Sequence, residues 1–448
     1  MLAAAAFGWI TGVGTALAQL DISGSPSSDV TPSTCHKVPR PSASAIATNS
    51  TSLDAGTLLF QARFRGDVRT GQLVAYDLTT EGSAGAAQWD AAAVLPPRAA
   101  RNILTRDGTV PGGGGGIDFL RDDLRESKRS ALGDIGHSDP QYVGALNFGY
   151  ESLPIGTPGR TSYRAFVQSK LDSDGRALKP MLYVGANDGM LHGFDAETGV
   201  EQFAYVPSTL IPKLNEPMEA DDAHRYFVDG HLTVGDAYID AGGGAGWVSV
   251  LVGTTGAGGR TVFALDVSDP HSVRGSNVLW EFTDPDLGLT TGEPTIARMA
   301  DGTWAAVFGN GYNSDRHRAV LFVVRLEDGV LLRKIDTGIG APGSPNGLAT
   351  PSLLADGTRT IQTMFAGDLQ GNLWAFDVSA RAAPAWKSKY HAGPDPAPLF
   401  TARDPSGNVQ PITVPIDIGS HPDGGYMLYF GTGRYLEAND NSVGPNPQ

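Results

Sequence analysis

Short apolar runs recur along this chain in pairs, and each pair alternates apolar and polar positions. The first run closes with glycine, a polar turn follows, and the second run ends in a charged residue. Alternation of this kind predicts paired β-strands with one face in a core and the other toward solvent. The copies span Met181–Gly199, Trp247–Pro270, Trp304–Gly329 and Thr363–Ala380, with a weaker early copy at Leu58–Gly82 and a truncated late one at Tyr426–Glu437.

The spacing of these hairpins predicts a β-propeller. The second runs of copies two to five end at residues 195, 266, 325 and 377, so the separations are 71, 59 and 52 residues. A two-strand unit cannot bury its face alone, whereas four-strand blades stacked around an axis can. Further apolar runs supply an outer strand after copies two to five: VEQFAYVP, NVLWEFTD, VLLRKIDTG and AWKSKY. We therefore predict an all-β fold with one blade per hairpin and an incomplete blade at Tyr426.

Two segments interrupt the repeat. The first is a run of five glycines, Gly112–Gly116, followed by a stretch in which Asp122 or Asp123 is predicted to cap a short helix. The second, Pro207–Gly230, is predicted to be a helical or irregular insertion before the third blade.

The start of the chain is typical of an exported protein. Ala3–Ala18 carries no charge and ends in Ala-Leu-Ala, which predicts a signal peptide at residues 1–18 cleaved between Ala18 and Gln19. The stretch is shorter than the about 20 apolar residues of a membrane-spanning helix. No Lys or Arg precedes it, so an uncleaved anchor and an ordinary Ala-rich helix remain alternatives.

Residues 19–54 are rich in Ser, Thr, Pro and Ala, a composition typical of a flexible linker. The predicted organisation is therefore a signal peptide, this linker, a propeller at 55–440 and a tail at 441–448. Cys35 lies in the linker and is the only cysteine, so no intrachain disulfide can form. An incidental exposed thiol is favoured there over a structural or reactive one.

Composition narrows the function. The 448 residues include 33 Lys and Arg against 48 Asp and Glu, a formal net charge of −15, which argues against a general nucleic-acid binder. The 58 glycines and 30 prolines argue against long helical bundles and agree with many short strands.

One group of polar residues could carry chemistry. It comprises His224, Tyr226, Asp229, His231 and Asp236, which include metal-ligand and acid–base side chains. In a connection between blades such residues more often cap turns, and we favour that interpretation. The glycine-rich stretches lack the Gly-Lys-Ser/Thr of a phosphate-binding loop, so they are interpreted as turns.

Several long motifs resemble the C-terminal domain of the PilY family of type IV pilus assembly and tip-adhesin proteins. They include LGDIGHSDPQYVG, MLYVGANDGMLHGFDAETG, HRYFVDG, VLWEFTDPDLG, WAAVFGNGYNS, FAGDLQGNLWAFDVS and YMLYFGTGRYLE. The likeness runs from about Leu58 to Glu437. It implies a β-propeller of the quinoprotein-like type with short helical insertions. It also implies a non-enzymatic factor for pilus biogenesis, surface adhesion and twitching motility.

The resemblance further implies a place and partners. Such a protein is expected in the periplasm, at the outer-membrane surface or at the pilus tip, with minor pilins or other pilus assembly proteins as partners. A host or abiotic surface is a further expected contact. Family members carry a large region before the propeller and continue past the YFGTGRYLE motif. Because this chain stops at Gln448, we expect an incomplete propeller.

The family's calcium site resembles an EF-hand loop just before the FAGDLQGN motif. The corresponding stretch here is SLLADGTRTIQTMFAGD, in which Asp356 is the sole carboxylate before Asp368. Calcium needs several oxygen ligands, and Thr358, Thr360 and Gln362 are poor replacements for carboxylates. We therefore expect weak calcium binding, or none, at Asp356.

The main alternative function is a quinoprotein-like propeller dehydrogenase, whose blades carry a similar repeat. Such enzymes need a catalytic Asp, a calcium ion beside the quinone and often a vicinal cysteine pair, which Cys35 alone cannot form. The pilus factor is therefore favoured.

An unclosed propeller also predicts a free strand edge at Met427–Phe430. This edge is expected to pair with a minor pilin or a second copy, or to cause aggregation. Alternatively, the segment Leu58–Phe64 closes the ring.

Overall fold

The computed structural model describes residues 42–50, 53–54, 56–65, 70–97, 100–106, 108–109, 132–214, 216 and 224–436. The predicted signal peptide and its cleavage site, Cys35, the glycine run, the capped helix after it and the tail lie outside these residues.

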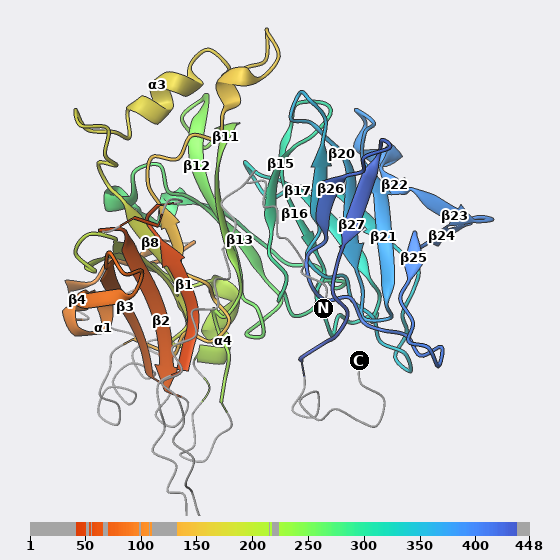
Figure 1. Cartoon of the computed structure of the whole chain (residues 1–448), viewed down its shortest axis with the longest axis horizontal. Coiled ribbons are helices and arrows are strands. Elements are labelled where there is room, and N and C mark those ends of the chain that lie inside the picture. Colours follow the sequence, from red (N-terminus) through yellow and green to blue (C-terminus); the bar gives the residue numbers. More distant parts are fainter. Residues whose placement is uncertain are drawn as a thin grey trace, which may run out of the picture.

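Six sheets follow one another along the chain as blades of a β-propeller, from the orange β1–β4 sheet on the left of Figure 1 to the blue β26–β27 hairpin on the right. The first contains β1 (Ser42–Thr48), β2 (Leu58–Arg65), β3 (Thr70–Leu78) and β4 (Ala84–Asp90). The second contains β7 (Gln141–Val143), β8 (Met181–Ala186), β9 (Met190–Asp195) and β10 (Glu201–Tyr205), extended by β5 (Ile103–Thr105) and β6 (Gly108–Thr109).

The next two sheets have four antiparallel strands each. The third contains β11 (Leu232–Asp240), β12 (Ala245–Thr254), β13 (Val262–Asp266) and β14 (Val278–Phe282). The fourth contains β15 (Thr295–Arg298), β16 (Trp304–Gly309), β17 (Val320–Arg325) and β18 (Leu331–Asp336).

The fifth and sixth sheets complete the described chain. The fifth contains β19 (Ser352–Ala355), β20 (Ile361–Gly367), β21 (Asn372–Asp377) and β22 (Lys387–Ser388), with β25 (Phe400–Thr401) on β21. A small hairpin, β23 (Tyr390–Ala392) and β24 (Asp395–Ala397), projects from it (Figure 1). The sixth contains β26 (Asp417–Ser420) and β27 (Tyr426–Tyr429).

Helices are few and short, as the sequence predicts. The α-helices are α1 (Ala91–Val94), α3 (Tyr163–Gln168) and α4 (Ile211–Leu214); the 3-10 turns are η2 (Tyr150–Ser152), η3 (Ser208–Leu210), η4 (Pro270–Ser272), η5 (Gly275–Asn277) and η6 (Ala383–Ala385). The predicted insertion before the third blade begins with η3 and α4. Within the described residues, no helix has the length and apolar character needed to span a membrane.

The hydrophobic core of the described residues consists of five clusters, and each lies between consecutive sheets. Phe60 and Phe194 belong to the cluster between sheets one and two, and Tyr183 and Phe263 to the next. Three further clusters join sheets three and four, four and five, and five and six. Packing between neighbours therefore supplies the buried area that one blade lacks.

The middle strands are covered on both faces, which corrects the expectation of one face toward solvent. Every residue of β8 and of β16 is buried. A strand packed between two neighbouring blades needs apolar side chains at nearly every position, and the sequence MLYVGA of β8 meets this need.

The predicted linker is too long at its C-terminal end. β1 lies inside residues 19–54 and pairs with β2 in antiparallel register. Each blade thus begins one strand before its predicted hairpin.

The sheets are not closed into a ring among the described residues. β27 pairs with β26, and the sixth sheet has two strands where the third and fourth have four. The alternative that Leu58–Phe64 closes the ring is wrong, because β2 uses both of its edges within the first sheet, pairing with β1 and β3.

Candidate functional site: polar clusters at the blade ends and the open edge

Four of the five polar residues singled out in the sequence lie together, facing a loop that precedes β7. His224, Asp229 and His231 each pair with a residue of the segment Asp134–Asp139. The pairs are Asp134–His224 (2.6 Å), His137–Asp229 (2.5 Å) and Asp139–His231 (3.3 Å). The ring of Tyr226 lies 4.6 Å from that of His224 and 5.7 Å from that of His137. These side chains thus pair across two facing loops rather than within a single turn.

Asp236 lies apart from this group, on β11. Its carboxylate is buried and accepts hydrogen bonds from the hydroxyls of Tyr163 (2.9 Å) and Ser249 (2.7 Å) and from Lys170 Nζ (3.0 Å). Burial, and then the Asp236 carboxylate, raise the pKa of Tyr163. Asp236 therefore fixes α3 against the third sheet rather than extending the histidine cluster.

A second buried network occupies the second blade. Glu201 accepts from Arg101 Nε at 2.5 Å and faces His192 Nδ1 at 2.7 Å, while the other imidazole nitrogen lies 3.2 Å from Asp188. Burial alone would lower the pKa of His192, but the carboxylates of Asp188 and Glu201 outweigh it and raise the value to about 9. The negative charges of Asp188 and Glu201 are thus balanced in the core by the positive charges of Arg101 and His192.

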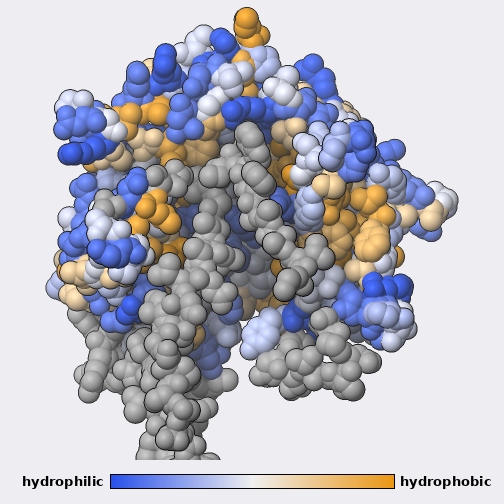
Figure 2. Space-filling model, in the orientation of Figure 1, coloured by the Kyte–Doolittle hydropathy of each residue, from blue (hydrophilic) through white to orange (hydrophobic). Residues whose placement is uncertain are grey.

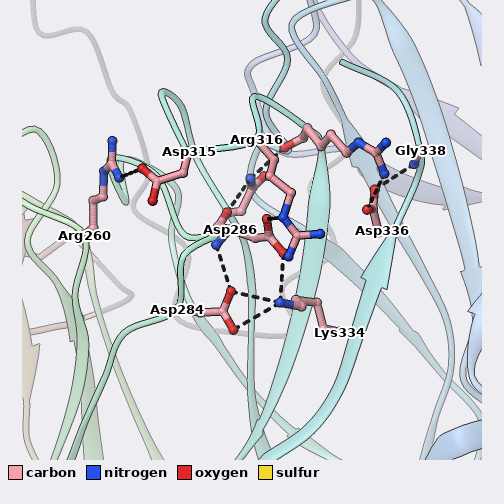
Figure 3. Close-up of polar contacts among 10 residues, drawn as sticks. Arg260, Asp284, Asp286, Asp315, Arg316, Lys334, Asp336 and Gly338 are labelled. Carbon is pink, nitrogen blue, oxygen red and sulfur yellow. Dashed lines mark hydrogen bonds and ion pairs between the residues drawn. The ribbon is translucent and has the colours of Figure 1, made fainter. Parts of the chain in front are cut away.

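A third polar network joins sheets three and four (Figure 3). Lys334 on β18 lies 3.0 Å from Asp284 and 2.8 Å from Asp286, and Arg316 Nε lies 2.8 Å from Asp286. Burial opposes the charge on Lys334, yet the two carboxylates raise its pKa. Because Asp286 is buried, its charge requires both cations.

The loop at Asp356 does not fit a calcium ion. Its carboxylate accepts hydrogen bonds from the backbone N–H groups of Thr358 (2.8 Å) and Thr360 (3.1 Å) and from Gln362 Nε2 (3.0 Å). Asp404 accepts from backbone N–H groups two and four residues on in the same way. The hydrogen bond from Thr358 contributes most to lowering the pKa of Asp356. These donors make the carboxylate a turn cap, which is a common role for Asp in loops.

Within the described part of the chain, no three or more His, Cys, Asp or Glu side chains are placed to hold a metal ion. The polar clusters consist instead of matched acid–base pairs. Such pairs can position loops and hold or release protons near the pKa of their histidines.

The outer edge of β27 is a further candidate for function. Within the described residues β26 is its one strand partner. Tyr426 and Tyr429 are 57% and 50% exposed, and Phe400 is 53% exposed nearby, with its ring 6.3 Å from that of Phe430. Figure 2 shows apolar side chains on the visible surface around these C-terminal sheets. Leu428 and Phe430 pack partly buried against the core between sheets five and six.

The sequence interpretation missed the partners of the histidine cluster. The signal was present as complementary spacing: Asp134, His137 and Asp139 alternate acid, base, acid, and His224, Asp229 and His231 alternate base, acid, base. The motif LGDIGHSDPQYVG contributed only to the family likeness. His192 and Glu201 gave no such signal, because each lies alone within an apolar strand.

Comparisons with known proteins agree with the fold. Residues 132–446 match the family model of the PilY1 beta-propeller domain. A type IV pilus biogenesis factor PilY1 homolog of Xylella fastidiosa (strain Temecula1 / ATCC 700964) is 42% identical over 353 residues, which are 73% of this chain and 23% of that protein. The type IV pilus biogenesis factor PilY1 of Pseudomonas aeruginosa (strain UCBPP-PA14) is 40% identical over 354 residues, 72% of this chain and 29% of that protein.

A solved structure is similar as well. The crystal structure of the Pseudomonas aeruginosa PilY1 C-terminal domain has a TM-score of 0.56 and 36% sequence identity, and the similarity covers 68% of this chain and 62% of that chain. The present chain spans less than a third of the length of the full relatives it matches.

Proposed function

Because this chain belongs to the PilY1 beta-propeller family, we propose that it takes part in type IV pilus biogenesis as a non-enzymatic factor. The observation that carries the proposal is the family match over residues 132–446, which includes the strands from β7 to β27. Its relatives at 40–42% identity are named as pilus biogenesis factors. The alternative of a quinoprotein-like dehydrogenase has no comparable support.

The proposed site of action is outside the cytoplasm, in the periplasm, at the outer-membrane surface or on the pilus tip. The expected partners are minor pilins or other pilus assembly proteins, and adhesion to host or abiotic surfaces and twitching motility would depend on that assembly. The names of these relatives as pilus biogenesis factors, together with the signal peptide predicted at residues 1–18, support this location.

The proposed contact is strand addition at β27. A partner strand would extend the sixth sheet through backbone hydrogen bonds, while exposed Tyr426 and Tyr429 supply side-chain contacts. The third and fourth sheets have four strands each, so the same repeat can hold two more strands than the sixth sheet has. A minor pilin is the proposed donor, and a second copy of this chain is an alternative outcome of the test.

Deletion of the gene and complementation in the parent bacterium test the function. We expect fewer surface pili and loss of twitching motility, restored by the wild-type gene. Normal piliation and motility in the deletion strain would contradict the proposed function.

The docking mode has its own test. Tyr429→Lys places a charge on the open edge, and it should abolish co-purification with minor pilins while leaving the fold intact. Tyr390→Lys on the separate β23–β24 hairpin is the matched control, since Tyr390 is also exposed, at 42%. If both variants retain pilin binding, strand addition at β27 is wrong even where the deletion phenotype holds. Loss of self-association alone would identify a second copy as the donor.

A further inference from the structure

Two loops on separate parts of the propeller meet through a matched set of histidines and carboxylates. One loop, Asp134–Asp139, precedes β7, and the other, His224–His231, precedes β11. Each loop contributes both acids and bases, and each of the three histidine–carboxylate pairs runs between the loops. Such a set joins segments that are about 90 residues apart in sequence, as the hydrogen bond between His224 and Asp134 illustrates.

The pairs are linked to one another. Asn187, in the turn between β8 and β9, donates from Nδ2 to Asp134 (3.0 Å) and to Asp229 (3.2 Å), and its Oδ1 accepts from the backbone N–H of Phe227 (2.9 Å). The backbone N–H of His137 also donates to Asp229, at 3.0 Å. A buried amide that bonds to two of the three acids makes the pairs parts of one network.

Both loops are anchored in the core on either side of this network. Ile135 is fully buried between sheets one and two, and Val228 is fully buried between sheets two and three. The backbone approach is close as well, since a Cβ at Gly136 would lie 2.7 Å from Asp229 Oδ1. The ion pairs therefore join the ends of two adjacent blade interfaces.

We propose that the three pairs form a pH-dependent clasp, which holds the loop Asp134–Asp139 against the loop His224–His231 and loosens when His137 and His231 lose their protons. The clasp controls how readily these two loops separate from each other. It does not control unfolding of the core, because the core residues beneath the loops stay packed. This inference does not depend on the pilus function.

The charges around His137 and His231 determine the direction in which the pKa of each is shifted. The hydrogen bond to Asp229, reinforced by the charges of Asp229 and Asp139, raises the pKa of His137 against the opposing effect of burial. Burial would lower the pKa of His231, but Asp139 and Glu293 outweigh both burial and the nearby His137, and they raise it.

The other titratable groups that face the clasp are Tyr226, Asp134 and Glu293, and their pKa values are also shifted. Burial and the charges of Asp229 and Asp134 raise the pKa of Tyr226, with a smaller effect from Tyr435, so the phenol stays neutral in the same range. Burial would raise the pKa of Asp134, but the hydrogen bonds from His224 and Asn187, together with the charge of His224, outweigh it and lower the pKa. Burial raises the pKa of Glu293.

The sign of the pH dependence follows from the raised histidine values. A raised folded-state pKa gives a stabilising contribution that is complete below the ordinary histidine value of about 6.5 and is lost as the pH rises through the raised value. The clasp is therefore closed in mildly acidic solution and loosens as the pH rises above the ordinary histidine value. Because His137 is 65% exposed, its contribution should fall with added salt.

Hydrogen exchange of the whole chain between about pH 6 and pH 9 tests the clasp, after correction for the intrinsic pH dependence of exchange. We expect local opening of residues 132–144 and 224–231 to increase severalfold over this range, because the pKa values of His137 and His231 are raised in the folded state. Peptides from β16 and β17 serve as the internal reference, since a global loss of stability would reach them too.

The double variant His137→Gln, His231→Gln keeps polar side chains but cannot acquire charge. Its two loops should open more readily at about pH 6 than those of the wild type, and their opening should depend less on pH. His391→Gln is the matched control, because His391 lies exposed on β23.

Two results would overturn the proposal. One is corrected exchange of the two loops in the wild type that does not change with pH. The other is unchanged pH dependence in the double variant. If that variant does not fold, the wild-type measurement alone decides, since a pH-independent clasp contradicts the proposal.

Discussion

Replacement of His192 by glutamine tests whether a charged imidazole stabilises the core of the second blade. His192 is completely buried and lies between Asp188 and Glu201, and Arg101 binds the far side of Glu201. A protonated imidazole makes the four groups neutral as a set. Glutamine can donate one hydrogen bond here but leaves two buried carboxylates with a single cation.

The size of the effect follows from the pKa of His192. A rise from the ordinary 6.5 to about 9 corresponds to about 3 kcal/mol of unfolding free energy, and complete burial means that solvent screening removes little of it. Because the folded-state pKa is raised, this stabilisation is present in full below about pH 6.5. It declines between about 6.5 and 9 and is absent above that range.

Urea unfolding of the wild type and of His192→Gln across this pH range measures the effect. We expect His192→Gln to lower the free energy of unfolding by about 3 kcal/mol at about pH 6, and the two curves to converge above about pH 9. His391→Gln, at an exposed position on β23, is the control and should follow the wild type throughout.

A constant difference between wild type and His192→Gln at every pH would refute the reasoning. It would mean that the imidazole contributes packing and neutral hydrogen bonds, with no charge. A difference in unfolding free energy that grows with pH would refute the predicted direction of the pH dependence.

Three further substitutions test other contacts. Lys334→Met should lower the free energy of unfolding by about 2 kcal/mol by leaving buried Asp286 with one cation, and a urea series in high salt should show a smaller loss. Trp280→Phe should cost about 3 kcal/mol, because it removes the 2.8 Å hydrogen bond to the Leu326 carbonyl and leaves a small cavity; an unchanged thermal midpoint would contradict this. Asp356→Ala should cost about 1 kcal/mol through the lost turn cap and leave any calcium titration by calorimetry unchanged, whereas loss of tight binding would show a calcium site.

The sequence predicted the middle strands of the blades and the outer strands of blades two to five, but not the first strands. β8 and β16 are six-residue apolar runs and are easily recognised. β7, β15 and β19 have three or four residues, too few to show a period, and β1 lies in a segment rich in Ser, Thr and Ala. Such strands form because the neighbouring strand offers a partner, and tertiary context of this kind is absent from a local pattern.

The sequence predicted only part of the candidate site, again because tertiary contacts are absent from a local pattern. His231 and Asp236 are five residues apart, and the sequence suggested one cluster. Because β11 begins between them and a strand rises about 3.4 Å per residue, Asp236 lies about 17 Å further along, beneath α3. The loop Asp134–Asp139 meets the loop His224–His231 where Asn187 of the second blade bonds to both, and the complementary spacing of acids and bases does not by itself identify the two segments as partners.

The open edge illustrates the difference between an apolar strand and an exposed one. The sequence indicated Met427–Phe430 as the free edge, and within that run Leu428 and Phe430 have the strongest apolar character. In the structure, however, those two side chains pack against the core between sheets five and six, while Tyr429 is half exposed. A lysine at Leu428 or Phe430 would disrupt that core and reduce solubility whether or not any partner binds. A lysine at Tyr429 changes the edge without removing core contacts, so it separates loss of docking from loss of folding.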